Sequence, residues 1–285
     1  MMPLSTEYWF LFPAAIAIAT VAMATGIGGA VFFSPLFIIV LRLEPSVAIG
    51  TALITELFGF GSGVFAYWRR RLIDFRLGRQ LLVFSIPGAI FGTLAADAFP
   101  AVVLNTVFGT GIIFIGVQLY LSLRKDEVAE LDARIRGEEQ HETLLVDRAG
   151  NEYAYTIKRP NQGRLFAAIG GAFLGAISVG LAELQEYHLI ARCRVPSPVA
   201  VATSIFVVVV SVLVASLGHF YYFATSADAG VLSQVLSIVM FTIPGVVLGG
   251  QLGPMVQATV DPDRVKLGIA LLFIGVGMFM LFMVL

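Results

Sequence analysis

Long apolar segments alternate with short polar ones along the chain, and they fall into two sets of four. A hydrophilic stretch near the middle of the chain separates the two sets. Segments this long with so few charges predict membrane-crossing helices. The segments cover about residues 9–41, 46–68, 80–96 and 101–123, then 165–191, 197–223, 231–258 and 265–285.

The first segment, from Trp9 to Leu41, has an unusual length for a membrane helix. Its 33 residues contain no charge. One continuous helix would be about 50 Å long, whereas a bilayer core is about 30 Å thick and two full crossings would need about 40 residues. We therefore expect two shortened helices that meet at the glycines of 26–29 and form a re-entrant hairpin. Non-helical backbone at membrane depth must be buried in protein or line a cavity, so this cluster is a candidate binding site.

The two sets of segments resemble each other in sequence. Three short motifs recur in the same order, at spacings of 157, 159 and 152 residues. An internal duplication of this kind is common in secondary transporters. Each repeat would hold one broken, re-entrant hairpin and three transmembrane helices. The recurring pairs are 85–92 with 242–249, 114–117 with 273–276, and 47–52 with 199–204.

The distribution of Lys and Arg indicates how the repeats are oriented. If each first segment enters the membrane and returns, the repeats are inverted, and 17 basic residues share one side while only Arg42 lies on the other. If each first segment crosses once, the repeats are parallel and the division is 13 to 5. The positive-inside rule favours the inverted arrangement. The predicted fold is an all-α polytopic membrane protein of two inverted repeats, with both chain ends outside the cell.

The hydrophilic stretch predicts a small cytoplasmic insert with mixed α and β structure. Asp126–Arg136 has the pattern of a short amphipathic helix. Thr143–Ile157 alternates about a turn, as a β-hairpin does. The insert is too small for a core of its own and is expected to pack at the membrane surface. The predicted divisions are repeat 1 at 1–123, the insert at 124–163 and repeat 2 at 164–285.

Composition supports the membrane class and excludes several others. The chain is 58% hydrophobic and 13% charged, with a mean hydropathy of +0.89, which is far from the composition of a soluble domain. Its single cysteine, Cys193, excludes an internal disulfide and a cysteine-based metal cluster. No basic region precedes the first apolar run, so a cleaved signal peptide is not expected. We expect a multi-pass protein of the inner or plasma membrane, with no cofactor, metal or nucleic-acid partner.

The two hairpins predict an anion-binding site near the middle of the membrane. The helix after each break presents free backbone N–H groups and the positive end of its dipole, and glycine lets the backbone approach a ligand closely. The second break aligns with Ser178–Glu183. Close helix packing is the alternative role for such glycines. The candidate substrate-binding residues are Gly26, Gly28, Gly29, Thr51, Ser178, Gly180, Thr203 and Ser204.

Three acidic residues, Glu56, Glu183 and Glu186, lie within apolar segments. A carboxylate at membrane depth is costly unless it is neutralised or paired, so each one is a candidate for proton coupling or gating. Glu183 and Glu186 are three residues apart and share a helix face. The alternative is that they pair with a nearby basic side chain or cap a broken helix.

Two arginines, Arg192 and Arg194, flank Cys193 at the predicted cytoplasmic edge. They are candidates for gathering substrate anions or for lowering the pKa of the thiol. Their alternative role is to anchor the chain at the membrane interface.

Several of these motifs together resemble the TauE/SafE family of sulfite and organosulfonate exporters. They are Gly-Ile-Gly-Gly at 26–29, Pro35 six residues later, and the pattern Pro-x-x-Ala-x-Gly-Thr from Pro45 to Thr51. Their second-half counterpart is Pro198–Ser204. The resemblance covers the membrane part and leaves out the insert. It implies export of sulfite, sulfoacetate or a related sulfur anion from the cytoplasm, without ATP hydrolysis by this chain.

The expected function is therefore proton-linked export of a small sulfur-containing anion, and not an enzymatic reaction. An anion channel and a permease for carboxylates or other anions are the alternatives, and an intramembrane transferase ranks below both. No P-loop or His-Glu-x-x-His motif is present, so no catalytic residues are assigned. The expected partners are a small anion, protons and the lipid bilayer, and the sequence leaves the oligomeric state open.

Overall fold

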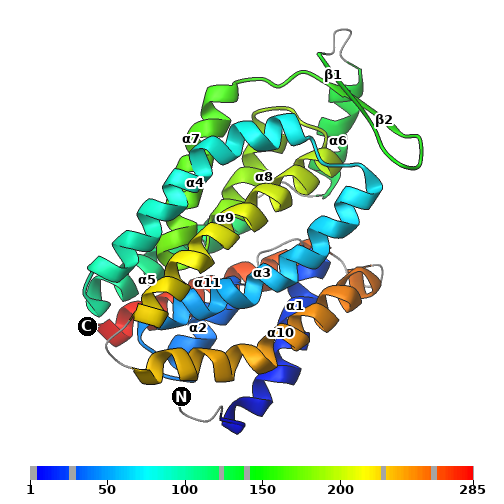
Figure 1. The fold of residues 1–285 in the computed structure, drawn as a ribbon. Helices are drawn as coiled ribbons and strands as arrows, with labels where there is room; N and C mark the ends of the chain where they lie inside the picture. The colour runs from blue at the N-terminus through cyan, green and yellow to red at the C-terminus, as the bar shows by residue number, and fades with distance from the viewer. Residues whose placement is uncertain are drawn as a thin grey trace.

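The structure is a computed structural model, and it describes residues 5–25, 30–121, 125–137, 142–225, 229–257 and 262–284. Within these ranges the chain is almost entirely helical, with one two-stranded sheet (Figure 1). The elements are η1 Glu7–Phe10, α1 Leu11–Thr25, α2 Ala30–Ile39, α3 Pro45–Arg70, α4 Phe75–Ala98, α5 Ala101–Tyr120, α6 Lys125–Arg136, β1 Thr143–Val146, β2 Glu152–Tyr155, α7 Pro160–Ile177, α8 Leu181–Ala191, α9 Ser197–Thr225, α10 Ala229–Gln257 and α11 Pro262–Val284.

Five of the described helices, α3, α4, α5, α9 and α10, are long and apolar enough to cross a membrane. The most buried of these spans are in α3 and α9, where 61% and 67% of the residues are buried, compared with 33–39% in the other three. Helices α3 and α9 therefore form the centre of the bundle, and the others leave more surface for lipid. The prediction of a polytopic helical membrane protein is confirmed.

Helices of the first half pack mainly against helices of the second half. Helix α1 lies along α10, and α7 lies along α4; α5 packs against α11, and α3 against α9. Helix α3 also contacts α10, and α9 also contacts α4. The contacts α1–α10 and α7–α4 have the same pattern in the order of the helices, and so do α3–α10 and α9–α4. The contacts α3–α9 and α5–α11 each join the helices of the same rank in the two halves.

Glycines allow the closest of these approaches, between α4 and α7. A Cβ at Gly92 would lie 2.1 Å from the carbonyl oxygen of Ala172, and a Cβ at Gly175 would lie 2.1 Å from that of Ala89. Small residues four apart let membrane helices pack backbone against backbone. Helices α10 and α1 approach each other in the same way, because a Cβ at Gly249 of α10 would lie 2.4 Å from the carbonyl oxygen of Ile16 on α1.

The long apolar segment that opens the second half is divided into two helices. In the second half, α7 ends at Ile177 and α8 begins at Leu181, so the helix is broken within the predicted stretch Ser178–Glu183. Glu183 lies in the first turn of α8 and not in the break itself. In the first half, α1 and α2 flank residues 26–29, and these four residues lie outside the described part of the chain.

The predicted insert contains the expected helix and hairpin, α6 and β1–β2. The strands pair antiparallel, with Thr143 opposite Tyr155. Hydrogen bonds join the insert to both halves of the protein. Oδ1 of Asp132 on α6 accepts a hydrogen bond of 2.9 Å from the backbone N–H of Ser197, and Oδ2 accepts one of 2.6 Å from its hydroxyl, which caps the start of α9. Figure 1 shows the insert at one end of the bundle, opposite the start of α1 and the end of α11.

Candidate functional site

A small cavity lies beside the break between α7 and α8, deep in the bundle. Its volume is about 10 Å³, close to the smallest that holds one water molecule. The polar groups that line it come from Glu56 of α3, from Ser178 and Gly180 in the break, and from Glu183 of α8. The remaining lining residues are Val31, Phe60, Leu174, Val179, Leu181, Ala182 and Val208.

The break owes its shape to two residues with positive φ angles. Ser178 has φ +57° and Gly180 has φ +108°, and at +108° a side chain would be strained, so glycine suits this position. Gly180 is the N-cap of α8, and its backbone N–H donates a hydrogen bond of 3.2 Å to Oε2 of Glu183. A carboxylate therefore already occupies the N-terminal end of α8, where the sequence predicts an anion.

The two halves meet at the break through a pair of serines. The hydroxyl groups of Ser34 on α2 and Ser178 are hydrogen-bonded to each other, and both residues are buried. The Ser178 hydroxyl also lies 2.6 Å from the carbonyl oxygen of Ile177, to which it donates. Sequence analysis did not select Ser34. The sequence feature that could have marked Ser34 is its hydroxyl group, which stands alone in an otherwise apolar helix, five residues after Gly29.

Glu56 lies in the middle of α3 and is 4% exposed. It lines the cavity together with Glu183, so two of the three predicted acidic residues face the same space. Glu186 lies one turn further along α8 and does not line the cavity. It is half-buried, and its charge acts on Tyr67 of α3.

The three predicted hydroxyl residues of α3 and α9 are buried but do not line the cavity. The hydroxyl of Thr51 donates to the carbonyl oxygen of Val47 in its own helix, at 2.6 Å. The hydroxyl of Thr203 accepts a 3.0 Å hydrogen bond from the backbone N–H of Asp74. Ser204 is 1% exposed, and its hydroxyl has no hydrogen-bond partner among the described residues. Gly26, Gly28 and Gly29 lie outside the described residues, although Val31, just after them, lines the cavity.

The arginines at the end of α8 do not activate the cysteine between them. Arg192 is exposed and Arg194 is half-buried, whereas Cys193 is 1% exposed. Burial raises the pKa of the Cys193 thiol to about 11. The thiol is therefore protonated at neutral pH, which argues against a reactive thiolate.

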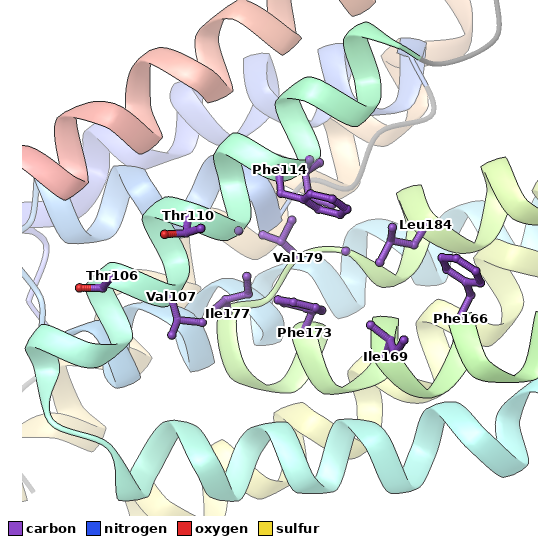
Figure 2. A pocket seen from close by; sticks show the side chains of 13 residues that line it. Thr106, Val107, Thr110, Phe114, Phe166, Ile169, Phe173, Ile177, Val179 and Leu184 are labelled. Atoms are coloured by element: carbon purple, nitrogen blue, oxygen red, sulfur yellow. The ribbon is translucent and has the colours of Figure 1, made fainter.

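A larger groove of about 550 Å³ lies between α5, α7 and α8 (Figure 2). Its lining is apolar apart from the hydroxyls of Thr106 and Thr110 at one end, and the Thr106 hydroxyl donates to its own helix. The groove shares Val179 and Gly180 with the small cavity. It offers too few hydrogen-bond donors to hold an anion. The described residues also contain no group of three or more His, Cys, Asp and Glu side chains that would hold a metal ion.

A broken helix beside a polar cavity, inside a bundle of membrane spans, is the arrangement of a membrane transporter. The comparisons with known proteins agree. The family model described as "Sulfite exporter TauE/SafE" matches residues 11–280. The chain belongs to this family and is a multi-pass protein of the cell membrane.

Curated relatives cover most of the chain. "Probable membrane transporter protein YunE" of Bacillus subtilis (strain 168) is 24% identical over 265 residues, which are 90% of this chain and 91% of the relative. "Probable membrane transporter protein YjnA" of the same organism is 28% identical over 245 residues, 81% of this chain and 84% of the relative. No solved structure matches significantly.

Proposed function

We propose that this protein is a secondary transporter that exports a small sulfur-containing anion, such as sulfite or an organosulfonate, from the cytoplasm. The observation that carries the proposal is the N-terminal end of α8, which opens on the cavity and is capped by the carboxylate of Glu183. A carboxylate and an oxyanion use the same backbone donors, so the substrate takes the place of Glu183 at Gly180. Gly26, Gly28 and Gly29 are proposed to supply the corresponding donors from the first half.

Competition between Glu183 and the substrate provides a route to proton coupling. An arriving anion is repelled by the charges of Glu183 and Glu56 in the same cavity. When Glu183 takes up a proton it loses its negative charge, so it no longer repels the anion. The neutral carboxyl group also accepts a weaker hydrogen bond from the Gly180 N–H. A monovalent anion bound together with a proton then crosses without net charge. Glu186, one turn along α8, is proposed to assist as a gating residue.

The size of the cavity requires a conformational change. About 10 Å³ accommodates one water molecule at most, so an oxyanion enters only after the two hairpins separate. The hydrogen bond between Ser34 and Ser178 joins the two halves across the break. Breaking it is part of the proposed opening.

Two observations support an inverted arrangement of the repeats 1–123 and 164–285 around the insert 124–163. The first half begins at one end of the bundle and leads into the insert at the other end, and the second half runs back (Figure 1). The contacts between the halves are also reciprocal. With the insert in the cytoplasm, Arg192 and Arg194 lie on the cytoplasmic side and are placed to gather anions.

Reconstituted transport tests the proposal. Proteoliposomes loaded with sulfite should release it faster than protein-free liposomes, and external unlabelled sulfite should drive counterflow of labelled sulfite. Thiosulfate, sulfoacetate, acetate and chloride are the comparison anions. Saturable flux with counterflow supports a carrier. Unitary currents would identify an anion channel, and flux of acetate without flux of any sulfur anion would identify a carboxylate permease.

A further inference from the structure

Helix α8 carries two buried polar side chains with atoms that make no hydrogen bond to any described residue. Gln185 is 1% exposed and His188 is 4% exposed. Among the described residues, neither amide atom of Gln185 has a hydrogen-bond partner, and the same holds for Nε2 of His188. Buried unpaired polar groups cost folding stability, and polar residues at membrane depth mark the pathways of ions and substrates.

These two side chains lie on a single face of α8. Leu181, Gln185, His188 and Arg192 are spaced by four, three and four residues, which places them along one stripe of a helix. The stripe starts at the cavity, which Leu181 lines, and ends at the exposed Arg192. The His188 ring is held in place on this stripe, because it stacks on Phe166 of α7 with the ring centroids 4.3 Å apart.

A third unpaired polar group lies at the same depth on the neighbouring helix. Helix α9 packs against α8, and Ser204 precedes the cavity residue Val208 by one turn on the same face of α9. At about 1.5 Å per residue, Ser204 lies about 10 Å from the start of α9, and Gln185 about 9 Å from the end of α8. Both of these helix ends lie at the same side of the bundle, because only residues 192–196 separate them.

The corresponding helix of the first half lacks this polar stripe. When α2 and α8 are aligned at their first residues, Ser34 corresponds to Gln185 and Phe37 to His188. Ser34 is bonded to Ser178. Phe37 is fully buried and packs on Phe33, with the ring centroids 5.8 Å apart. The face of α2 is therefore apolar at Phe37, whereas the stripe of α8 is polar from Gln185 to Arg192.

We propose that Gln185, His188 and Ser204 line the route by which the anion passes between the cytoplasmic surface and the break at Ser178–Gly180. This inference rests on the proposed transport function. The amide, imidazole and hydroxyl groups supply neutral hydrogen-bond donors along the route. Neutral donors bind an anion strongly enough to admit it and weakly enough to release it, which conduction requires.

Cysteine accessibility tests this route directly, because the chain has only one cysteine. In a Cys193→Ala background, Gln185→Cys, His188→Cys and Ser204→Cys are treated from the cytoplasmic side with the anionic thiol reagent MTSES, which carries a sulfonate group. Ile190→Cys, on the opposite face of α8, and Ala202→Cys, on another face of α9, are the controls; both residues are buried. Each variant is compared with its parent by thermal unfolding and size-exclusion chromatography.

We expect modification of the three route cysteines at least tenfold faster than that of the controls, and slower modification when sulfoacetate is present. Sulfite is not used as the protecting anion, because it cleaves thiosulfonate reagents and disulfides. Equal rates at route and control positions, or no modification at 185 and 204, would overturn the route. A second variant does not depend on reactivity: Gln185→Leu should lower sulfite flux at least tenfold while leaving the melting temperature equal or higher. Unchanged flux in this variant also overturns the route.

These outcomes separate the route from the function on which it rests. If wild-type sulfite flux is normal but the route cysteines are inaccessible, the route is wrong and the transport function stands. If the route cysteines react selectively but sulfoacetate does not protect them and sulfite does not cross the membrane, the route is retained and the substrate assignment is wrong.

Discussion

The hydroxyl group of Tyr155 donates a hydrogen bond of 2.7 Å to Oδ2 of Asp74, a residue 81 positions earlier in the chain. Oδ1 of Asp74 accepts hydrogen bonds from the backbone N–H groups of Arg76 and Leu77 and so caps α4. The N–H of Asp74 in turn donates to Thr203 of α9. One buried aspartate therefore joins the insert to both halves, and the insert is an integral part of the folded protein.

Replacement of Tyr155 by Phe should lower the free energy of unfolding by about 1.5–3 kcal/mol, the range for a hydrogen bond to a charged group. Denaturant unfolding of the purified protein measures the change. Tyr153→Phe is the control, because the Tyr153 hydroxyl lies 3.5 Å from Asp147 and the residue is half-buried. If Tyr155→Phe lowers the free energy of unfolding no more than Tyr153→Phe does, the hydrogen bond between Tyr155 and Asp74 does not stabilise the fold.

The same pair predicts a dependence of stability on alkaline pH. Burial, followed by the hydrogen bond and charge of Asp74, raises the pKa of Tyr155 above its ordinary value of 10. A group with a raised pKa contributes stability that is fully present below its unfolded pKa and is lost as pH rises through the folded value. The advantage of the wild type over Tyr155→Phe should therefore be constant up to about pH 10 and shrink above it. Unfolding curves of both proteins between pH 7 and 11 check this.

Replacement of Gly175 by Ala should lower the free energy of unfolding by about 1–3 kcal/mol, as overpacking does. The added Cβ would lie 2.1 Å from the carbonyl oxygen of Ala89 on α4, and a backbone atom cannot move aside as a flexible side chain does. Gly275→Ala in α11 is the matched control, because its Cβ meets no atom within 4 Å. Thermal unfolding compares the two. Equal effects would show that α4 and α7 do not need close backbone contact.

Replacement of Glu183 by Gln should make the flux of an organosulfonate, whose sulfonate group stays ionised between pH 5 and 8, independent of pH. The neutral amide cannot release or take up the proton that the proposed mechanism requires, and it competes less strongly with the anion for the Gly180 N–H. Flux in proteoliposomes between pH 5 and 8 is the measurement. Glu152→Gln, on the exposed surface of the hairpin, should keep the wild-type profile. A pH profile in Glu183→Gln that matches the wild type would remove Glu183 from coupling.

Cys193 should react slowly with iodoacetamide at neutral pH. With a pKa of about 11, about one thiol in ten thousand is ionised at pH 7, and only the thiolate is nucleophilic. The rate should rise about tenfold per pH unit towards pH 11, and unfolding should raise it sharply at pH 7. Mass spectrometry measures the modified fraction. Fast modification of the folded protein at pH 7 would show that Arg192 and Arg194 activate the thiol after all.

The sequence by itself determined the class of the protein and much of its architecture. The length of each apolar run, compared with the thickness of a bilayer, is a local property of the chain, and it was sufficient to predict the spans. The alignment of the two halves then predicted the division of residues 165–191 into two helices. The alternation of residues 143–157 was sufficient for the hairpin. The motif pattern also identified the family, which the match over residues 11–280 confirmed.

Only the tertiary structure decided which polar side chains meet. The bond between Ser34 and Ser178 joins residues 144 positions apart, and the hydroxyl of Thr203, a predicted substrate-binding residue, accepts a hydrogen bond from the backbone N–H of Asp74. It was equally invisible in the sequence that the amide of Gln185 has no hydrogen-bond partner in the part of the chain that the structure describes. The physical reason is that α2 is apolar around most of its circumference, while α8 carries polar side chains on several faces, so in neither helix does the hydrophobic pattern define the rotation. The rotation, and with it the partner of each polar group, is fixed only when the helices pack.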